Sequence, residues 1–280
     1  VHDQGELPIV SVATMSGRTI KAAPDHPFLT PRGWIAAGDL VPGKDYVGIP
    51  RVDEEFGDSS MSPEEARLLG YLVGDGCISQ RSLAFVNADR EVIEDFMRCA
   101  QACGFYAEDK AHDNEKVVAR KIVLKSTATR WGRGGEPAVL LWLRKHGLYK
   151  SNSYTKRIHS GVFASGKEAV ANFIGAYWSC DGMFSIRHVN KKTTMIGSAT
   201  TVSEILARDL LNALSLLNIS CRVRENNIKK ETKRQAGGVY KSFQVITSRR
   251  HEVSKFVALP GHCSAKRKKA AEDFAAFLQP

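Results

Sequence analysis

The pattern of apolar and polar positions predicts the same succession of secondary-structure elements twice. A capping box at Ser62–Glu65, with a proline in the first helical position, opens a helix that ends at Gly76. A second capping box at Ser165–Glu168 opens another helix, which ends at Gly182. Both helices contain long apolar runs and finish with the dipeptide Asp-Gly. This agreement indicates an internal duplication.

The segments that follow the two helices also correspond. In the first half, a strand-like stretch at 77–86 is followed by a helix that begins after Asp89, a strand at 117–124 and a short helix at 138–145. The second half has strands at 183–188 and 193–199, a helix around 205–214, a strand at 239–246 and a short helix at 249–257. Both halves follow an α-β-β-α-β-β-α plan, which predicts an α+β fold built twice.

Small residues mark matching faces of the two Asp-Gly helices. Aligning Asp75 with Asp181 places small residues in pairs four positions apart, on one face of each helix. They are Gly70 and Gly74 in the first helix and Ala176 and Cys180 in the second. Small side chains let two helix backbones approach closely, so we expect these faces to pack together and the helices to end side by side.

Two adjacent carboxylates at helix C-termini predict a cation site. Helix C-termini carry partial negative charge, so Asp75 and Asp181 would repel each other unless a cation lay between them. Hard oxygen ligands of this kind suit Mg²⁺ or Ca²⁺. A single Asp-Gly is explained as well by a helix-ending turn, but the duplication favours a metal site.

Composition points to a polyanionic partner. The 280 residues carry 40 Lys and Arg against 30 Asp and Glu, a net charge of +10. Residues 1–58 contain 5 basic and 9 acidic side chains, whereas residues 59–280 contain 35 and 21. A basic body is typical of nucleic-acid binding, although a solvated basic surface gives the same composition. No apolar run reaches the roughly 18 residues of a membrane span. The six cysteines form no CxxC pair, which disfavours structural zinc and fits a reducing cytosol.

The two helix motifs resemble those of a known family. LLGYLVGDG (68–76) and FIGAYWSCDG (173–182) resemble the paired motifs of LAGLIDADG homing endonucleases. The resemblance covers about residues 62–257. It implies two pseudo-symmetric halves whose saddle-shaped antiparallel sheets straddle double-stranded DNA. Because both motifs lie in one chain, it also implies a monomer.

The N-terminal segment resembles a second family. Residues 19–40 are similar to the central block of an intein splicing domain, with Ala23 where that family usually has threonine and His26 in the place of its histidine. The chain begins at Val1 and ends at Pro280, without the terminal nucleophile or the His-Asn pair that splicing needs. We therefore expect the endonuclease part of an intein with a piece of its splicing domain, and no splicing.

These resemblances define the expected domains and activity. The domains are a partial Hint-like segment at 1–58, a first LAGLIDADG half at 59–160 and a second half with a basic C-terminal helix at 161–280. The implied activity is sequence-specific cleavage of both DNA strands with 3′ overhangs. Mg²⁺ is the implied cofactor, and Ca²⁺ is expected to support binding without efficient cleavage. The metal ligands would be Asp75, Asp181 and the carbonyls of Gly74 and Cys180.

Two lysines are candidates for orienting water or stabilising charge. The repeat alignment sets Lys121 opposite Lys241, in strands where the family carries catalytic lysines. Lys125 competes with Lys121, because the alignment of short strands can slip. A phosphate contact or plain surface charge explains any one of these lysines about equally well.

Side chains that read DNA bases are expected at alternate strand positions. The candidates are Ser79, Arg81 and Asn87 in the first half and Ser185, Arg187 and Lys191 in the second. DNA contacts are also expected from the densest basic stretch, which includes Arg222, Arg224, Lys229, Lys230, Lys233 and Arg234. The middle of that stretch, 228–238, is expected to form a flexible hairpin loop that follows phosphates.

Three rival functions remain open from the sequence. A catalytically inactive DNA-binding relic is disfavoured because both aspartates are present, and an RNA maturase is disfavoured by the intein-like N-terminus. A pure autoprocessing protein is disfavoured by the missing nucleophile. An endonuclease of this kind is expected in the cytoplasm, associated with the nucleoid in a prokaryote.

Overall fold

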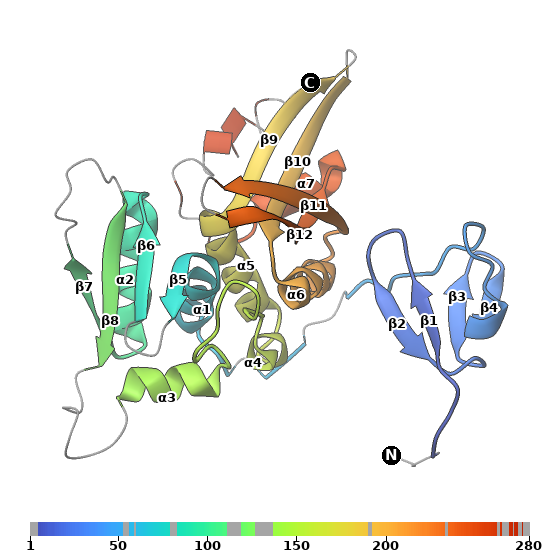
Figure 1. Ribbon diagram of the computed structural model, residues 1–280, viewed down its shortest axis with the longest axis horizontal. Coiled ribbons are helices and arrows are strands. Elements are labelled where there is room, and N and C mark those ends of the chain that lie inside the picture. The colour runs from blue at the N-terminus through green and yellow to red at the C-terminus, as the bar shows by residue number, and fades with distance from the viewer. Residues whose placement is uncertain are drawn as a thin grey trace.

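Two related α+β halves and a small β unit form the protein (Figure 1). The computed structural model describes residues 5–52, 56–58, 60–78, 83–110, 119–126, 137–189, 192–232, 235–261, 264, 269–270, 272–273 and 276. Each half runs helix, two strands, helix, two strands, helix, which confirms the duplicated plan predicted from the sequence. No helix in these described ranges is long and apolar enough to cross a membrane.

The first half is a four-stranded antiparallel sheet with its helices. The helices are α1 (Pro63–Asp75), α2 (Arg90–Ala102) and α3 (Ala138–Lys145). The strands are β5 (Gly76–Ile78), β6 (Leu83–Asn87), β7 (Phe105–Lys110) and β8 (Arg120–Ser126). They pair in the order β5-β6-β8-β7.

The second half repeats this arrangement. A short helix, α4 (Ser160–Ala164), precedes α5 (Lys167–Asp181), α6 (Glu204–Leu216) and α7 (Arg250–Val257). The strands are β9 (Gly182–Val189), β10 (Lys192–Thr201), β11 (Arg222–Thr232) and β12 (Gln235–Thr247). Their order, β9-β10-β12-β11, is the order of the first sheet.

The stretch 228–238, expected as a flexible loop, is mostly strand. β11 continues to Thr232 and β12 begins at Gln235. The register pairs Ile228 with Tyr240, two residues that favour strands. Cross-strand pairing thus extends the hairpin well into the basic stretch, and the loop prediction was wrong there.

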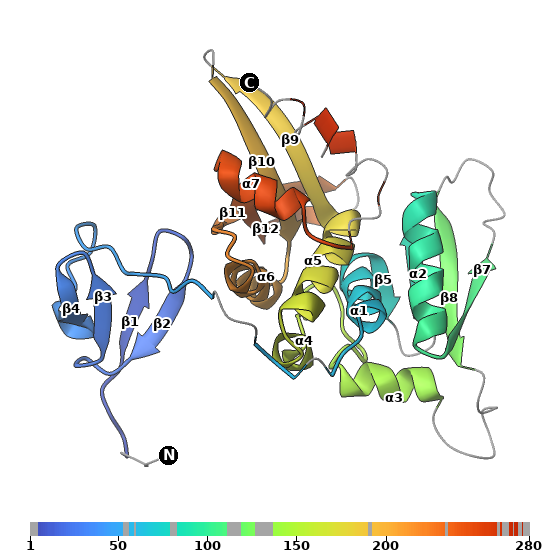
Figure 2. The same cartoon turned by 180° about the vertical axis from the view of Figure 1, so that it is seen from behind.

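The helices cover the same side of both sheets. Figure 2 shows α2 in front of the first sheet and α6 and α7 in front of the second. Paired strand residues such as Phe85 with Ile122, and Ala199 with Val245, are buried in the core. Because side chains alternate along a strand, their neighbours point to the other side. We call these opposite faces, which α1–α7 do not cover, the helix-free faces.

The two motif helices, α1 and α5, pack together at the centre as the small residues predicted. A Cβ on Gly70 would lie 2.4 Å from the carbonyl oxygen of Phe173 and 3.0 Å from the Cβ of Ala176. A Cβ on Gly74 would lie 2.6 Å from the Cβ of Cys180. Real Cβ contacts are longer than this, so the backbones approach as closely as they do because both positions are glycine.

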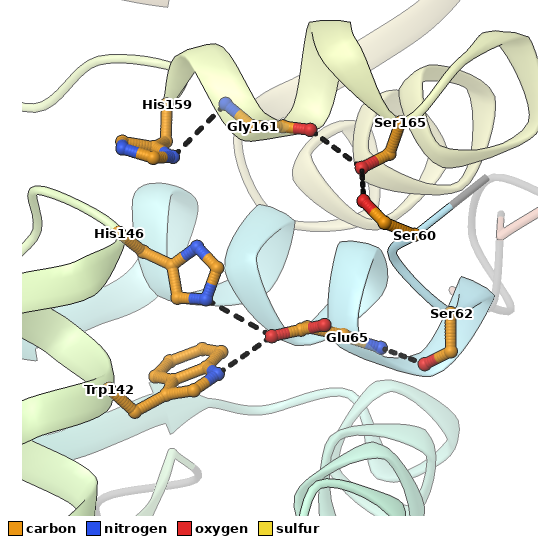
Figure 3. Close-up of polar contacts among 8 residues, drawn as sticks. All are labelled: Ser60, Ser62, Glu65, Trp142, His146, His159, Gly161 and Ser165. Atoms are coloured by element: carbon orange, nitrogen blue, oxygen red, sulfur yellow. Dashed lines mark hydrogen bonds and ion pairs between the residues drawn. The ribbon is translucent and has the colours of Figure 1, made fainter. Parts of the chain in front are cut away.

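Only half of the first predicted capping box forms (Figure 3). The hydroxyl of Ser62 accepts a hydrogen bond from the backbone N–H of Glu65 at 3.2 Å, as predicted. The Glu65 carboxylate, however, accepts from Trp142 Nε1 at 2.9 Å and contacts His146 Nε2 at 3.0 Å. Glu65 therefore ties α1 to α3 and its C-terminal cap.

The second predicted capping box is wrong. The N-cap of α5 is Gly166, which has φ 99° and makes no side-chain cap. Ser165 instead ends α4, where its hydroxyl donates to the Gly161 carbonyl at 2.7 Å and lies 3.1 Å from the hydroxyl of Ser60 (Figure 3). The helix α4, whose N-cap is His159, lies just before α5. Ser165 is the C-cap of α4 and therefore does not cap the N-terminus of α5.

The N-terminal unit consists of two small hairpins beside the second half. Its elements are β1 (Val10–Ala13), β2 (Thr19–Ala22), β3 (Pro27–Thr30), β4 (Gly33–Ala36) and a 3₁₀ turn at Ala37–Asp39. Its buried core holds only Ala22, Phe28 and Ala37 among the described residues. The unit is attached to the second half by hydrogen bonds from Val223 N to Ser16 O at 2.9 Å and between Val52 and Asn218 in both directions.

Candidate active site

The two motif aspartates lie at the ends of touching helices. Asp75 is the last residue of α1 and Asp181 the last of α5, and the residues just before them, Gly74 and Cys180, are in contact. The next residue in each motif is a glycine that begins the first strand of its sheet. The carboxylates therefore lie where the central helices meet the two sheets, with Asp75 partly exposed and Asp181 exposed.

Asn87 supports Asp75. Its Nδ2 donates to Asp75 Oδ2 at 2.6 Å, and its Oδ1 accepts from the backbone N–H of Asp89 at 2.7 Å. Both the nitrogen and the oxygen of the Asn87 side-chain amide are thus hydrogen-bonded within the protein. The prediction that Asn87 reads DNA bases has no support from this geometry, because strand alternation turns it toward the helices.

Lys156 is a functional candidate that the sequence did not indicate. It lies in the connection between α3 and α4, and its Nζ donates to the carbonyl oxygens of Gly74 and Gly76, both at 2.9 Å. Its own carbonyl accepts from the Ser203 hydroxyl at 2.8 Å. One lysine of the connection is therefore fixed to the second half by its backbone and to the first half by its ammonium group.

Lys156 is also coupled electrostatically to both acids. The residue is 8% exposed. Burial lowers the pKa of its ammonium group, while the carboxylates of Asp181 and Asp75 oppose that shift. A buried cation needs charge or hydrogen-bond compensation, and here two carbonyls and two carboxylates supply it. No feature of the sequence distinguishes Lys156 from the other lysines, because its partners come from distant segments.

The donor set suits a hard divalent cation. The Gly74 carbonyl, adjacent in the chain to Asp75, already accepts from the Lys156 ammonium group, so this oxygen would have to bind a metal ion alongside that group. Mg²⁺ commonly takes one or two protein carboxylates and completes its shell with water and substrate phosphate. Across the described ranges no group of three or more His, Cys, Asp and Glu side chains forms a metal cluster. A metal here would therefore rely on the two carboxylates, backbone oxygen and the substrate.

The thiol of Cys180 is not suited to that role. Burial raises its pKa well above the usual range, and the nearby charges of Asp75 and Asp181 raise it further. A thiol that stays protonated is a poor ligand, and Mg²⁺ prefers oxygen. Of the atoms of Cys180, the backbone carbonyl oxygen and not the thiol remains a predicted metal ligand.

The predicted equivalence of Lys121 and Lys241 is wrong. Gly76 pairs with Phe85, which pairs with Ile122. In the second half Gly182 pairs with Ala199, which pairs with Val245. Ile122 thus corresponds to Val245, and the residue that corresponds to Lys121 is Gln244.

Lys241 consequently points to the face of the second sheet that the helices cover. It lies three residues from Gln244, and an odd shift moves a side chain to the other face of a sheet. Its Nζ pairs with Glu225 at 2.7 Å, and the pKa of Lys241 is raised by that carboxylate. Lys121 points to the helix-free face, as does its competitor Lys125, which is ion-paired with Glu108.

Apart from Asn87, the predicted DNA-binding residues fall into four groups. Arg222 and Arg224 are exposed and, by alternation with the core-facing Val223, lie on the helix-free face of the second sheet. Ser185 is on the same face, but its hydroxyl is buried and has no hydrogen-bond partner among the described residues. Of Arg187, Lys229 and Lys230 only the backbone is described, and Ser79, Arg81, Lys191, Lys233 and Arg234 lie outside the described residues.

Comparison with protein families agrees with this architecture. The model of the LAGLIDADG-like domain matches residues 62–130 and 168–259, which include both motif helices and both sheets. The chain belongs to the LAGLIDADG family. The family assignment accounts for the duplicated plan, the packed motif helices and the terminal aspartates.

Curated relatives of this LAGLIDADG chain are much longer proteins. It is 28% identical over 267 residues to the replicative DNA helicase DnaB of Rhodothermus marinus, which covers 95% of this chain and 27% of the helicase. It is 30% identical over 230 residues to the protein RecA of Mycobacterium tuberculosis, which covers 80% of this chain and 27% of RecA. The chain therefore spans about a quarter of the length of the curated relatives it matches.

A solved structure of the same fold is that of I-DmoI in complex with DNA and Mn. It superimposes with a TM-score of 0.41 at 8% identity, covering 71% of this chain and 96% of that one.

Proposed function

We propose that this LAGLIDADG chain is a site-specific endonuclease that hydrolyses one phosphodiester in each strand of a long double-stranded DNA site and leaves 3′ overhangs. The observation that carries the proposal is the acid pair at the touching ends of α1 and α5, next to the buried ammonium group of Lys156. Carboxylates repel the phosphates of DNA. A protein that only binds DNA gains nothing from two of them here, whereas metal-dependent hydrolysis requires them.

Each part of the site has a role in this proposal. A bound Mg²⁺ would activate water and stabilise the charge that develops on the phosphate. Asp75 and Asp181 would hold the metal and each serve one strand. Asn87 keeps the Asp75 carboxylate in one orientation, and Lys156 holds positive charge beside both acids. Ca²⁺, which is larger and tolerates less regular geometry, is expected to support binding without efficient cleavage.

The relatives support a proposal about the gene context. A replicative DNA helicase and RecA each contain a stretch similar to this chain, and that stretch makes up about a quarter of each protein. A similar segment within longer proteins that carry different names supports an inserted element. We infer an intein-encoded enzyme that acts as a monomer on cytoplasmic, nucleoid-associated DNA. The N-terminal unit would be the Hint-like part, and its exposed Leu29 and Trp34 fit a unit that packs against further chain.

Cleavage of a randomised duplex library with Mg²⁺ tests the enzyme proposal. The native chain is compared with Asp75→Asn, Asp181→Asn and the control Asp39→Asn, an exposed carboxylate of the N-terminal unit. We expect one long degenerate site to be enriched by the native chain and the control, and to be lost or only nicked in the two motif variants. Sequencing of the ends reports the stagger.

Duplex binding in Ca²⁺ separates the alternatives. Motif variants that keep the duplex affinity but lose cleavage support the endonuclease. A native chain that binds duplex DNA tightly without cutting any member of the library would leave an inactive DNA-binding relic. Preference for structured RNA over duplex DNA would favour a maturase.

A further inference from the structure

A pocket of about 420 Å³ lies between the N-terminal unit and the second half. The unit contributes the turn after β1 and the residues around Arg51, and the second half contributes the end of α6, the start of β11 and the turn from β12 into α7. Figures 1 and 2 both show β1 and β2 on the side of the second half that carries α6. The pocket is thus formed by two units that are far apart in sequence.

Four arginines line this pocket, which we call the arginine pocket. Arg18 and Arg51 come from the N-terminal unit, and Arg222 and Arg249 come from the second half. Within the described part of the chain, none of the four forms an ion pair with a carboxylate. Arg18 instead donates to the hydroxyls of Ser16 and Ser215, at 3.1 Å and 3.0 Å. Among the described residues, therefore, no carboxylate is paired with any of these four guanidinium groups.

Glu252, the one carboxylate among the described residues that line the pocket, is already engaged. Glu252 Oε2 accepts from the backbone N–H of Ser220 at 2.8 Å and lies 3.9 Å from the ammonium group of Lys255. It is 6% exposed. Glu252 thus holds the end of α6 to α7, and its charge offsets only part of that of the four guanidinium groups.

Two further features indicate an anion as the missing partner. Thr247 lines the pocket, and its buried Oγ1 has no hydrogen-bond partner among the described residues. The helix α7 begins beside it after Arg249, whose side chain makes no capping hydrogen bond. The first turn of a helix carries unpaired N–H groups and partial positive charge, both of which suit phosphate.

The place of the pocket in the sheet favours DNA as the source of that phosphate. Arg222 lies on the helix-free face with Arg224, and it also lines the pocket. Gly182, the residue after Asp181, pairs with Ala199 in β10, which pairs with Val245 in β12, which pairs with Val223 in β11. Gly182 and Val223 are therefore three strand spacings apart, roughly 14 Å. The pocket is therefore at the outer edge of the second sheet, level with the acid pair.

We propose that the arginine pocket binds a backbone phosphate of the DNA target, so that the N-terminal unit and the second half grip the duplex together. The proposal rests on the proposed function, because it takes duplex DNA as the ligand. It adds a contact outside the two sheets, which makes the N-terminal unit part of the DNA-binding surface.

The test is the salt dependence of duplex binding by the full chain. Affinity for a labelled mixed-sequence duplex is measured by fluorescence anisotropy in Ca²⁺ over a range of salt concentrations. The variants are Arg51→Gln, Arg249→Gln and the double variant. The matched control is Arg32→Gln, an exposed arginine of the same unit that is ion-paired with Asp45 at 2.6 Å. Thermal unfolding confirms that each variant is folded.

We expect the double variant to bind more weakly and to lose about 0.9 from the slope of log affinity against log salt, the value for one phosphate contact. The control should match the native chain. A double variant with the slope and affinity of the control overturns the pocket proposal while leaving the endonuclease intact. A native chain that binds no duplex overturns the proposed function itself.

A second arm distinguishes DNA phosphate from a free anion. Inorganic phosphate is added to the native chain and the double variant, and the shift in Tm is measured. Stabilisation by phosphate that depends on the arginines, combined with an unchanged duplex slope, would assign the pocket to a small anion and overturn the DNA proposal. A lowered slope supports it, with or without a Tm shift.

Discussion

Asn87 donates a 2.6 Å hydrogen bond to Asp75, and the position that corresponds to Asn87 in the second half is Thr201. The correspondence follows from the register, since Gly76 pairs with Phe85 and Gly182 with Ala199. Both residues accept from the backbone N–H two positions later, at 2.7 Å in the first half and 3.1 Å in the second. Threonine has no amide group to donate, so the amide that Asn87 directs at Asp75 has no counterpart at position 201.

This asymmetry predicts a strand-specific defect. Asn87→Thr keeps an oxygen for the turn and removes the amide that orients Asp75. We expect unchanged duplex binding, slower cleavage of the strand that Asp75 serves, and accumulation of nicked DNA, which strand-specific labels would report. The control is Thr201→Ser, which keeps the hydroxyl. Equal slowing of both strands would contradict the assigned role of Asn87.

Lys156 is expected to matter for cleavage more than for affinity. Lys156→Met removes the ammonium group that lies between Gly74, Gly76 and the two acids. Removing a group that stabilises developing charge typically costs about 10²-fold in rate, so we expect a loss of that order in single-turnover cleavage with Mg²⁺. Lys255→Met is the control, since Lys255 also donates to a carbonyl, that of Asn218. If both variants cleave at the native rate, Lys156 is structural.

The contact of α1 with α5 predicts a rescue by exchange of small residues. Gly74→Ala places a Cβ 2.6 Å from that of Cys180, and overpacking of this kind costs about 1–3 kcal/mol in the free energy of unfolding. Cys180→Gly in the same chain should recover part of that loss. Gly70→Ala meets the backbone oxygen of Phe173, so no side-chain deletion can relieve it. Urea unfolding of these variants and of Cys180→Gly alone measures these effects. If the losses of the two single variants simply add in the double variant, the packing model is contradicted.

The two motif tyrosines should respond differently to removal of their hydroxyls. Tyr71 donates to the fully buried carboxylate of Asp95 at 2.6 Å. The hydroxyl of Tyr177 is buried with no hydrogen-bond partner among the described residues. Hydrogen bonds to charged groups contribute about 1.5–3 kcal/mol, so Tyr71→Phe should lower the free energy of unfolding by that amount. Tyr177→Phe should be neutral or stabilising, and equal losses would refute the difference.

Glu65 predicts a pH dependence of stability. The hydrogen bond with His146 lowers the pKa of the Glu65 carboxyl, and that with Trp142 lowers it further against the effect of burial. A carboxyl with a lowered folded pKa stabilises the fold above its unfolded pKa, about 4.3, and this stability is lost as the pH falls through the folded pKa. Glu65→Gln should therefore lower Tm at neutral pH. The difference from the native chain should shrink in acid, and a gap that stays constant down to pH 3 would contradict this linkage.

Predictions that depend on contiguous residues were largely confirmed. The duplicated order of elements, the Asp-Gly helix ends and the packed small residues of α1 and α5 all follow from local patterns. Amphipathic spacing and end signals act within one or two helical turns, so they are visible in a single segment. The capping boxes failed where tertiary structure supplied a competing partner, as Trp142 and His146 did for Glu65.

By itself, then, the sequence determined the duplication, the α+β class and the pair of aspartates. Only the tertiary structure showed that Lys156 is the basic residue beside these two aspartates. Strand register depends on hydrogen bonds with another strand, and a shift of three residues put Lys241 on the opposite face from the position expected. The contacts of Lys156 join a connection, a helix end and the cap of α6, which are separated by up to 129 positions in the chain and meet only when the core has formed.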